Sequence, residues 1–240
     1  MRLFTSIWLT AICALFVTGA PSGGLVHGAQ DAGNPSAPRG LDQTLDLYVR
    51  DGLVYYRALK GDRGRLDAYV RGLASTPIEK ESSAAQLAFW LNAYNAIVLH
   101  TVIDHYPMPM RSKDYPAGSI RQIPGAFERL THRIAGRTLT LDQIEQSVLA
   151  EFHDPRVYFA LGRGAVGSGR LGSEAFGSES LDRQLNEVAR ECVNRAQCVE
   201  VDRGQDVVRV SSIFSWREAA FSSVYAEKAA PGLASRSSIE

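Results

Sequence analysis

The stretch of chain from Ser83 to His105 is apolar on almost every side, and it restricts the possible folds more than any other feature. When Phe89–Ile103 is wound as a helix at about 100° per residue, apolar side chains cover one broad face and most of the opposite side. The members of the broad face are Trp90, Leu91, Tyr94, Ile97, Val98 and Thr101. A helix that is apolar nearly all round must be buried. The sequence therefore predicts one central helix surrounded by the rest of the domain.

The ends of this helix also have sequence signals. Ser83 followed three residues later by Gln86 has the pattern of a capping box, in which each side chain bonds the backbone of the other residue. Pro107 and Pro109 are expected to end the helix on the other side, because proline disfavours helical backbone before it.

Shorter patterns predict the elements around the central helix. Apolar residues at helical spacing predict helices over Leu41–Val49 and Arg65–Leu73, and Thr140 with Gln143 predicts a capped helix over the following twelve residues. Two hairpins are expected, one over Thr131–Thr140 and one formed by 198–201 with 207–211. Together these elements predict a single compact α+β domain with more helix than strand.

The N-terminus reads as an export signal. Met1 and Arg2 precede an apolar run over Leu3–Val17, and small residues follow it. We expect a signal peptide over residues 1–29 with an uncertain cleavage site, a flexible linker over 30–40, the domain over 41–225 and a disordered tail over 226–240. The alternative is an uncleaved N-terminal anchor. Export predicts a periplasmic or extracellular protein that has no membrane contact once the signal is cut.

Charge and spacing argue against several partners. Lys and Arg total 26 and Asp and Glu total 26, so no net field attracts a polyanion, and no basic stripe with interleaved aromatic residues suggests nucleic-acid binding. No His, Cys or Asp residues stand at metal-ligand spacing with a third in view. We expect no metal and no cofactor; the oligomeric state is open.

Export changes the meaning of the cysteines. After signal removal only Cys192 and Cys198 remain, and an even count in an oxidising compartment predicts one structural disulfide between them. Two free, half-buried thiols are the alternative.

Three polar residues interrupt the predicted central helix: Asn92, Asn95 and His100. Buried amides and imidazoles need hydrogen-bond partners, so one interpretation is that they hold neighbouring loops in place. The other is that one side of the helix lines a cleft in which they contact a ligand. His100 is the only one of the three that could act as a general base.

A glycine-rich segment after Asp154-Pro155-Arg156 is a second candidate region. The apolar residues 157–161 form a short strand or helix that runs into GRGAVGSGRLG, where Arg163 adds positive charge and Ser168 offers a hydroxyl. The segment is neither a phosphate loop nor a serine-hydrolase elbow, and a flexible surface loop is the alternative. Glu145, near a predicted helix start, is interpreted first as a carboxylate complementing the helix dipole.

The order of these blocks resembles a known family. The chain carries VYYRALKGDRGRLDAYVRGL, AFWLNAYNAIVLHTVIDHYP, LTLDQIEQSVL, DPRVYFAL with its glycine-rich loop, and VSSIFSWREAAF. Over about Tyr48 to Phe221 it is similar to the domain-of-unknown-function 547 family. The resemblance implies a compact exported α+β domain of bacteria whose biochemical activity is not established.

The chain departs from the family pattern at the glycine-rich loop. Family members usually carry Asn-Cys-(small)-(small)-x-Ser-Cys-Pro there, whereas Arg163 stands for the first Cys and Ser168 for the second. Gly162, Gly167 and Gly169 replace the Asn, Ser and Pro, and Tyr158 stands where His is common. A thiol mechanism is therefore in doubt, since a serine hydroxyl needs a base far more than a thiol does.

Two functions from different classes remain. The favoured one is a binding or interaction domain for a small-molecule or peptide ligand, with Asn95, Arg156 and Arg163 among the ligand contacts and Arg156 supplying a fork for a carboxylate. The other is a hydrolase or transferase with Ser168 as nucleophile, His100 as base and Asn92 orienting or stabilising an oxyanion.

Overall fold

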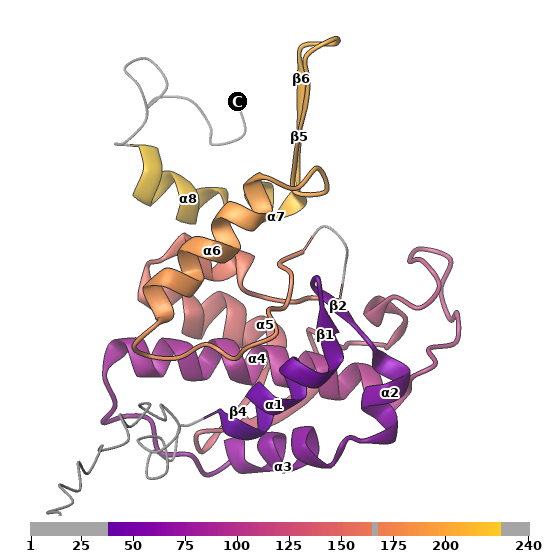
Figure 1. The fold of residues 1–240 in the computed structure, drawn as a ribbon, viewed down its shortest axis with the longest axis vertical. Coiled ribbons are helices and arrows are strands. Elements are labelled where there is room, and N and C mark those ends of the chain that lie inside the picture. The colour runs from indigo at the N-terminus through magenta and orange to yellow at the C-terminus, as the bar shows by residue number, and fades with distance from the viewer. Residues whose placement is uncertain (1–37, 165–167, 227–240) are drawn as a thin grey trace, which may run out of the picture. The chain divides into compact units, whose positions relative to one another are not determined.

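The computed structural model describes residues 38–164 and 168–226. The predicted signal peptide, all but the last residues of the predicted linker and all but the first residue of the predicted tail lie outside this part. Within it the fold is α+β, as predicted, with helices and three separate two-stranded antiparallel sheets (Figure 1). None of the helices in the described ranges has both the length and the apolar character that crossing a membrane requires.

The first elements form a helical layer with one small hairpin. In chain order they are α1 (Arg39–Tyr48), β1 (Val49–Arg50), β2 (Leu53–Val54), α2 (Tyr56–Gly61), α3 (Gly64–Leu73) and α4 (Ser83–His105). Helix α1 begins two residues before the predicted start, inside the predicted linker, and α3 covers the predicted segment with one extra residue. Elements α2 and the β1–β2 hairpin were not predicted.

Short turns of helix and one hairpin form the middle of the chain. In chain order they are η2 (Ile120–Gln122), β3 (Thr131–Ile134), β4 (Arg137–Thr140), α5 (Leu141–Gln143), η3 (Ile144–Val148), η4 (Leu149–Phe152) and η5 (Pro155–Phe159). The hairpin and the Thr140–Gln143 capping box are confirmed. The single helix expected after Thr140 is wrong, because the backbone passes from an α turn through a π turn (η3) to a 3-10 turn (η4).

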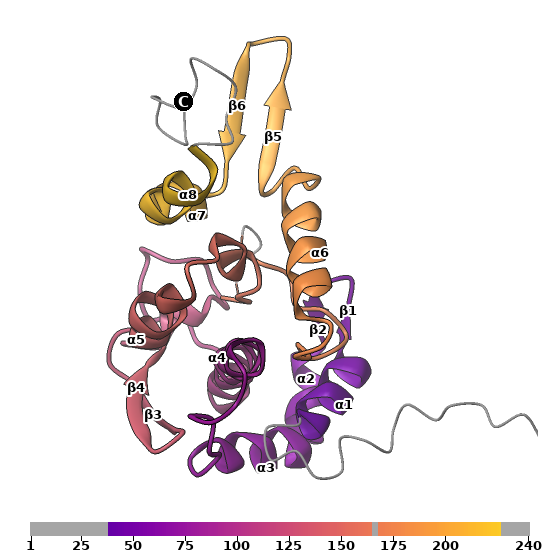
Figure 2. The same cartoon turned by 90° about the vertical axis from the view of Figure 1, so that its left-hand side faces the viewer.

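The last elements are α6 (Leu181–Val193), the hairpin β5 (Val199–Asp202) and β6 (Val207–Val210), α7 (Ser212–Trp216) and α8 (Glu218–Tyr225). The β5–β6 hairpin was predicted from the sequence, whereas the helices α6, α7 and α8 were not. In Figures 1 and 2 the hairpin projects away from the helices around α4.

Helix α4 is the buried centre that the sequence predicts. Every residue from Leu87 to Leu99 is buried. One hydrophobic cluster covers one side of α4 and includes the β3–β4 hairpin, η5 and α6. A second cluster packs α1 to α3 against Ala96, Leu99 and Ile103 on the other side. Figure 2 looks nearly along α4 and shows these elements arranged around it.

The start of α4 differs from the prediction by one residue. Ser82, not Ser83, is the N-cap, and its hydroxyl accepts from the Ala85 backbone N–H at 3.2 Å. Gln86 then stands four residues beyond the cap, so it cannot complete a capping box and donates instead to the Glu81 carbonyl at 2.9 Å. The helix ends at His105, before Pro107, as expected.

Candidate functional site

A hollow with a cavity volume of about 670 Å³ lies beside the glycine-rich loop and is called the Arg163 pocket. Three separate parts of the chain build it: the segment around η2, the glycine-rich loop, and the segment from the β5–β6 hairpin into α7. Its lining residues are Tyr115, Ser119, Ile120, Arg121, Phe127, Arg163, Ser168, Gln197, Val210, Ser211, Ser212, Ile213 and Trp216. This is a size and a mixture of apolar and hydroxyl groups typical of small-molecule sites.

The charges that line the Arg163 pocket are all positive. Arg121 and Arg163 are its ionisable cations, and the described lining contains no Asp, Glu, His or Lys. Arg121 pairs with Glu128 and lies 4.5 Å from the centre of the Phe127 ring. An anionic group entering this pocket would meet cations and no lining carboxylate.

Behind the pocket wall lies a buried ion cluster centred on Glu145, which is 4% exposed. Arg163 Nε donates to Glu145 Oε2 at 3.0 Å, and Arg217 Nε donates to Oε1 at 3.1 Å. The Tyr94 hydroxyl of α4 also donates to Oε2, at 3.3 Å. The π turn η3 carries Glu145, and such turns are frequent at functional sites.

The electrostatics of this cluster favour a fully charged Glu145. Burial alone raises the pKa of the Glu145 carboxyl, but Arg163 and Arg217 lower it more, so the pKa lies below its ordinary value. Burial raises the pKa of the Tyr94 hydroxyl and keeps it neutral. The charged groups in direct contact are then two guanidinium cations and one carboxylate, which leaves one positive charge in excess beside the pocket.

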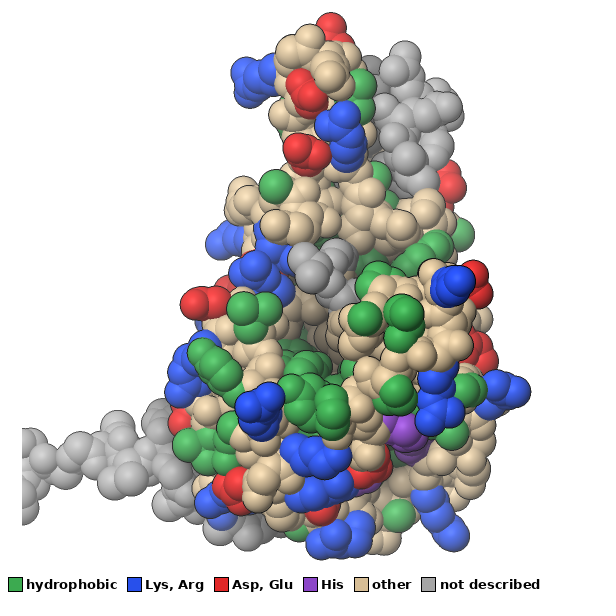
Figure 3. Space-filling view, turned by 90° about the vertical axis from the view of Figure 1, so that its right-hand side faces the viewer, with side chains coloured by type: hydrophobic (Ala, Val, Ile, Leu, Met, Phe, Trp, Pro, Cys, Tyr) green, Lys and Arg blue, Asp and Glu red, His purple; other side chains and the backbone are tan. Residues whose placement is uncertain are grey.

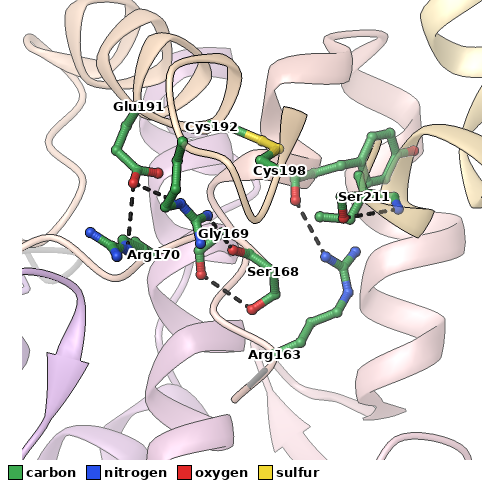
Figure 4. Close-up of a disulfide and its surroundings, with 11 residues drawn as sticks. Arg163, Ser168, Gly169, Arg170, Glu191, Cys192, Cys198 and Ser211 are labelled. Carbon is green, nitrogen blue, oxygen red and sulfur yellow. Dashed lines mark hydrogen bonds and ion pairs between the residues drawn. A yellow bond between two sulfur atoms is a disulfide. The ribbon is translucent and has the colours of Figure 1, made fainter. Parts of the chain in front are cut away.

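Ser168 lies in the wall of the Arg163 pocket and is itself buried. Its hydroxyl donates to the Gly169 carbonyl at 3.3 Å, as Figure 4 shows. Its own carbonyl accepts from Arg195 Nη2 at 2.9 Å. Gly169 must be glycine, because a Cβ there would lie 1.9 Å from the Phe159 carbonyl oxygen. The loop is therefore held tightly at Ser168 and Gly169.

Ser168 also borders a smaller hollow of about 170 Å³ on the side of the β1–β2 hairpin. Its other lining residues are Gly52, Leu53, Val54, Tyr56, Gly162, Gly164, Gly169, Arg170 and Leu171. Figure 3 shows that one face of the molecule is hollowed near its middle and that hydrophobic side chains gather beside the hollow.

His100 is engaged in a different polar cluster, on the α3 side of α4. Its Nε2 lies 3.2 Å from Asp67 Oδ1 and its Nδ1 lies 3.2 Å from Asp104 Oδ2. Arg63 joins both carboxylates, at 2.8 Å from Asp67 and 2.6 Å from Asp104. His100 is not among the described residues that line either hollow bordered by Ser168.

The two asparagines of α4 each hold a loop by a matched pair of backbone bonds. Asn92 donates to the Phe176 carbonyl at 2.8 Å and accepts from the Phe176 N–H at 2.9 Å. Asn95 donates to the Ala160 carbonyl at 3.0 Å and accepts from the Gly162 N–H at 2.9 Å. These contacts fit the loop-holding alternative, and a ligand role for either residue stays a prediction.

Arg156 is surrounded by partners from its own domain. Its Nε lies 3.0 Å from Asp154 Oδ1 and its Nη2 lies 2.7 Å from Asp154 Oδ2, which is a bidentate pair. Its Nη1 bonds Asp182 and Asn186 of α6, each at 2.8 Å. The guanidinium thus joins η5 to α6, and it lies outside the lining of the Arg163 pocket.

The predicted disulfide between Cys192 and Cys198 is present, with the two Cα atoms 5.3 Å apart. It joins the end of α6 to the start of β5, and both cysteines are buried. Figure 4 shows the disulfide above Ser168. Arg195, inside the closed loop, donates to the Ser168 carbonyl, so the disulfide loop supports one wall of the pocket.

Sequence reasoning missed several residues of this site, namely Tyr115, Arg121, Arg217, Trp216 and the central position of Glu145. The segment 210–221 mixes apolar and polar residues and gives no clear signal, since the 62% exposure of Trp216 is seen only in the structure. In the described ranges no group of three or more His, Cys, Asp or Glu residues could hold a metal ion.

Comparison with known proteins supports the resemblance read from the sequence. Residues 78–193 match the model of a family described as "Protein of unknown function, DUF547". The match contains α4, Glu145, the glycine-rich loop and the whole of α6 with Cys192, and it ends before Cys198. No curated protein and no solved structure matches the chain.

Proposed function

Taking the DUF547 match of residues 78–193 as the premise, we propose that the chain is an exported binding domain whose Arg163 pocket takes a small-molecule or peptide ligand. One observation carries this proposal: a buried arginine lines a pocket of about 670 Å³ whose described lining has no carboxylate. A pocket of this kind favours a ligand with an anionic group.

Arg163 supports ligand binding better than Arg156 does. Both pair with a carboxylate of the domain, but Arg156 bonds Asp154, Asp182 and Asn186 at once. Arg163 shares its one carboxylate, Glu145, with Arg217, so the cluster retains positive charge. Arg163 gives its Nε and Nη2 to Glu145 and its Nη1 to the Tyr158 carbonyl, so in this proposal it attracts an anion through the net charge of the cluster and not as the carboxylate fork expected at Arg156.

The hydrolase alternative needs a base beside Ser168, and the described lining supplies none. His100, its proposed base, contacts Asp67, Asp104 and Arg63 instead. Ser168 does line the pocket, so the alternative stays a prediction with its own test.

Ligand binding is tested by thermal shift with a set of mono- and dicarboxylates, organic phosphates and dipeptides. Binding should raise the Tm in the wild type and fail to raise it in Trp216→Ala. Tyr55→Ala is the matched control, because Tyr55 is an exposed aromatic residue outside the described lining. Equal shifts in all three proteins would place the ligand elsewhere.

Catalysis is tested by labelling with a fluorophosphonate probe beside Ser168→Ala and His100→Ala. We expect no specific labelling of the wild type. Labelling that disappears in both variants would replace the binding proposal by a serine hydrolase.

Export is tested separately by the intact mass of the protein recovered from the expressing cells. We expect a mature N-terminus near residue 30. A mass that retains Met1–Val17 would support the uncleaved anchor.

A further inference from the structure

The β5–β6 hairpin carries an unusual amount of exposed apolar surface. Its register pairs Val201 with Val208 and Val199 with Val210, which places four valines on one face. Val201 is 59% exposed and Val208 is 60% exposed. Figures 1 and 2 show the hairpin projecting away from α4 and its neighbours. Val199, at the start of β5, packs against the hydrophobic core, so the open part of the valine face is formed by Val201 and Val208.

The hairpin also has two open edges. Within the described residues, β5 pairs with β6 and with no other strand, so one row of backbone N–H and C=O groups on each strand faces outward. Exposed strand edges with apolar side chains invite the addition of a further strand. The opposite face carries Glu200 and Arg209, 3.5 Å apart, together with Asp202 and one valine, Val207.

The base of the hairpin opens into the Arg163 pocket. Gln197, just before β5, and Val210, at the end of β6, both line the pocket, as does Trp216, which is 62% exposed. The valine face, the strand edges and the cationic pocket therefore form one continuous surface.

We propose that this surface binds an extended peptide with a free C-terminal carboxylate, which adds as a strand to the hairpin and places its carboxylate in the Arg163 pocket. The inference rests on the proposed function, since it needs the pocket to be a binding site. Backbone bonds to a strand edge supply affinity, and alternate side chains of the peptide lie on the valine face.

The direction of the peptide follows from the position of the pocket. Its carboxyl end must lie at the base of the hairpin, and β5 runs from the base to the tip. A peptide on the β5 edge is then antiparallel to β5, which is the more stable pairing. Arg121 and the excess positive charge of the Glu145 cluster attract the carboxylate, and the described lining has no acidic group to repel it.

The test uses the full-length chain, immobilised, and two random heptapeptide libraries that differ only in a C-terminal acid or amide. Retained peptides are identified by mass spectrometry, and the best one is titrated in both forms. We expect the acid to bind about ten- to a hundredfold more tightly than the amide, because a charge-assisted hydrogen bond is lost. This comparison needs no variant of the protein.

Variants then locate the strand. Val201→Thr with Val208→Thr should weaken binding of the acid peptide at least about tenfold. Leu47→Thr should leave binding unchanged, because Leu47 is an exposed apolar residue of α1 that lines neither hollow bordered by Ser168. Unfolding curves check that each variant is folded. Equal loss in both variants would overturn the assignment to the hairpin.

Other outcomes separate this inference from the proposed function. Equal binding of acid and amide overturns carboxylate capture. If no peptide is retained while small carboxylates still raise the Tm, peptide binding at the hairpin is wrong and ligand binding in the Arg163 pocket stands. The chain could instead associate with itself and bind no peptide. If the Val201→Thr, Val208→Thr variant abolishes that association, the hairpin binds a second copy of the chain and the inference is overturned.

Discussion

Helix α4 contributes to two buried polar regions that differ in how their hydrogen bonds and charges balance. The asparagine region consists of Asn92 and Asn95, each of which bonds one backbone N–H and one carbonyl of a neighbouring loop. The Glu145 cluster, which Tyr94 joins, sets two arginines against one carboxylate beside a pocket. The first region is neutral and closed, which suits a structural role. The second keeps a positive charge at a cavity, which suits ligand binding.

The largest effect expected is on the Glu145 cluster. Glu145→Gln keeps the side-chain volume but leaves two buried or half-buried guanidinium groups without their carboxylate. Removing one partner of a buried ion pair costs about 3–5 kcal/mol of the free energy of unfolding. Urea denaturation measures this loss of unfolding free energy. A loss below about 1 kcal/mol would show that Glu145 does not hold the two arginines in a buried ion cluster.

The asparagine region should lose less stability and no binding. Asn95→Ala leaves the Ala160 carbonyl and the Gly162 N–H without their side-chain partner, which costs about 2–3 kcal/mol. Thermal shift with the ligand set should still show binding in the folded variant. A variant of unchanged stability that no longer binds would turn Asn95 into a ligand contact and remove the distinction between the regions.

Acid should weaken the Glu145 cluster specifically. The folded-state pKa of Glu145 lies below the ordinary 4.5, so the unfolded chain takes up a proton first as the pH falls. The contribution of this carboxylate is full above about pH 5 and is lost as the pH drops through 4.5 towards the folded-state pKa. The free energy of unfolding, measured at several values between pH 7 and pH 3, should therefore decrease less steeply with falling pH in Glu145→Gln than in the wild type. An equal decrease in both proteins would contradict a Glu145 pKa lowered by the two arginines.

The smallest effect is expected at the His100 cluster. Asp104 is partly exposed, and exposed ion pairs contribute about 0–1 kcal/mol. Asp104→Asn should change the free energy of unfolding by less than about 1 kcal/mol at pH 7. A loss of unfolding free energy as large as that of Glu145→Gln would show that the His100 cluster stabilises the fold as strongly as the buried Glu145 cluster does.

Local patterns predicted much of the fold. The all-apolar character of α4 predicted its burial, and the turn Ala135-Gly136, with both residues at positive φ, matches the predicted hairpin. The single helix after Thr140 was wrong because nothing in its local pattern distinguishes a regular α-helix from one with a π turn. That turn carries Glu145, whose arginine partners stand 18 and 72 residues further along the chain.

The site was harder to predict for the same reason. Ser168 and Arg163 were identified from the glycine-rich loop, and both line the pocket. The rest of the lining comes from segments around Tyr115 and Trp216, whose proximity depends on long-range packing. His100 was linked to Ser168 by residue type alone, and the structure gives its ring nitrogens other partners.

The most direct test of the account is the NMR signal of the tryptophan indole N–H groups during titration with the carboxylate and dipeptide set. The chain has three tryptophans, and Trp216 lines the pocket whereas Trp90 is buried in the core. Each signal is assigned by its Trp→Phe variant. If the ligand binds in the Arg163 pocket, the Trp216 signal shifts saturably while the Trp90 signal stays in place. An unchanged Trp216 signal in the presence of a ligand that raises the Tm would contradict binding at the Arg163 pocket.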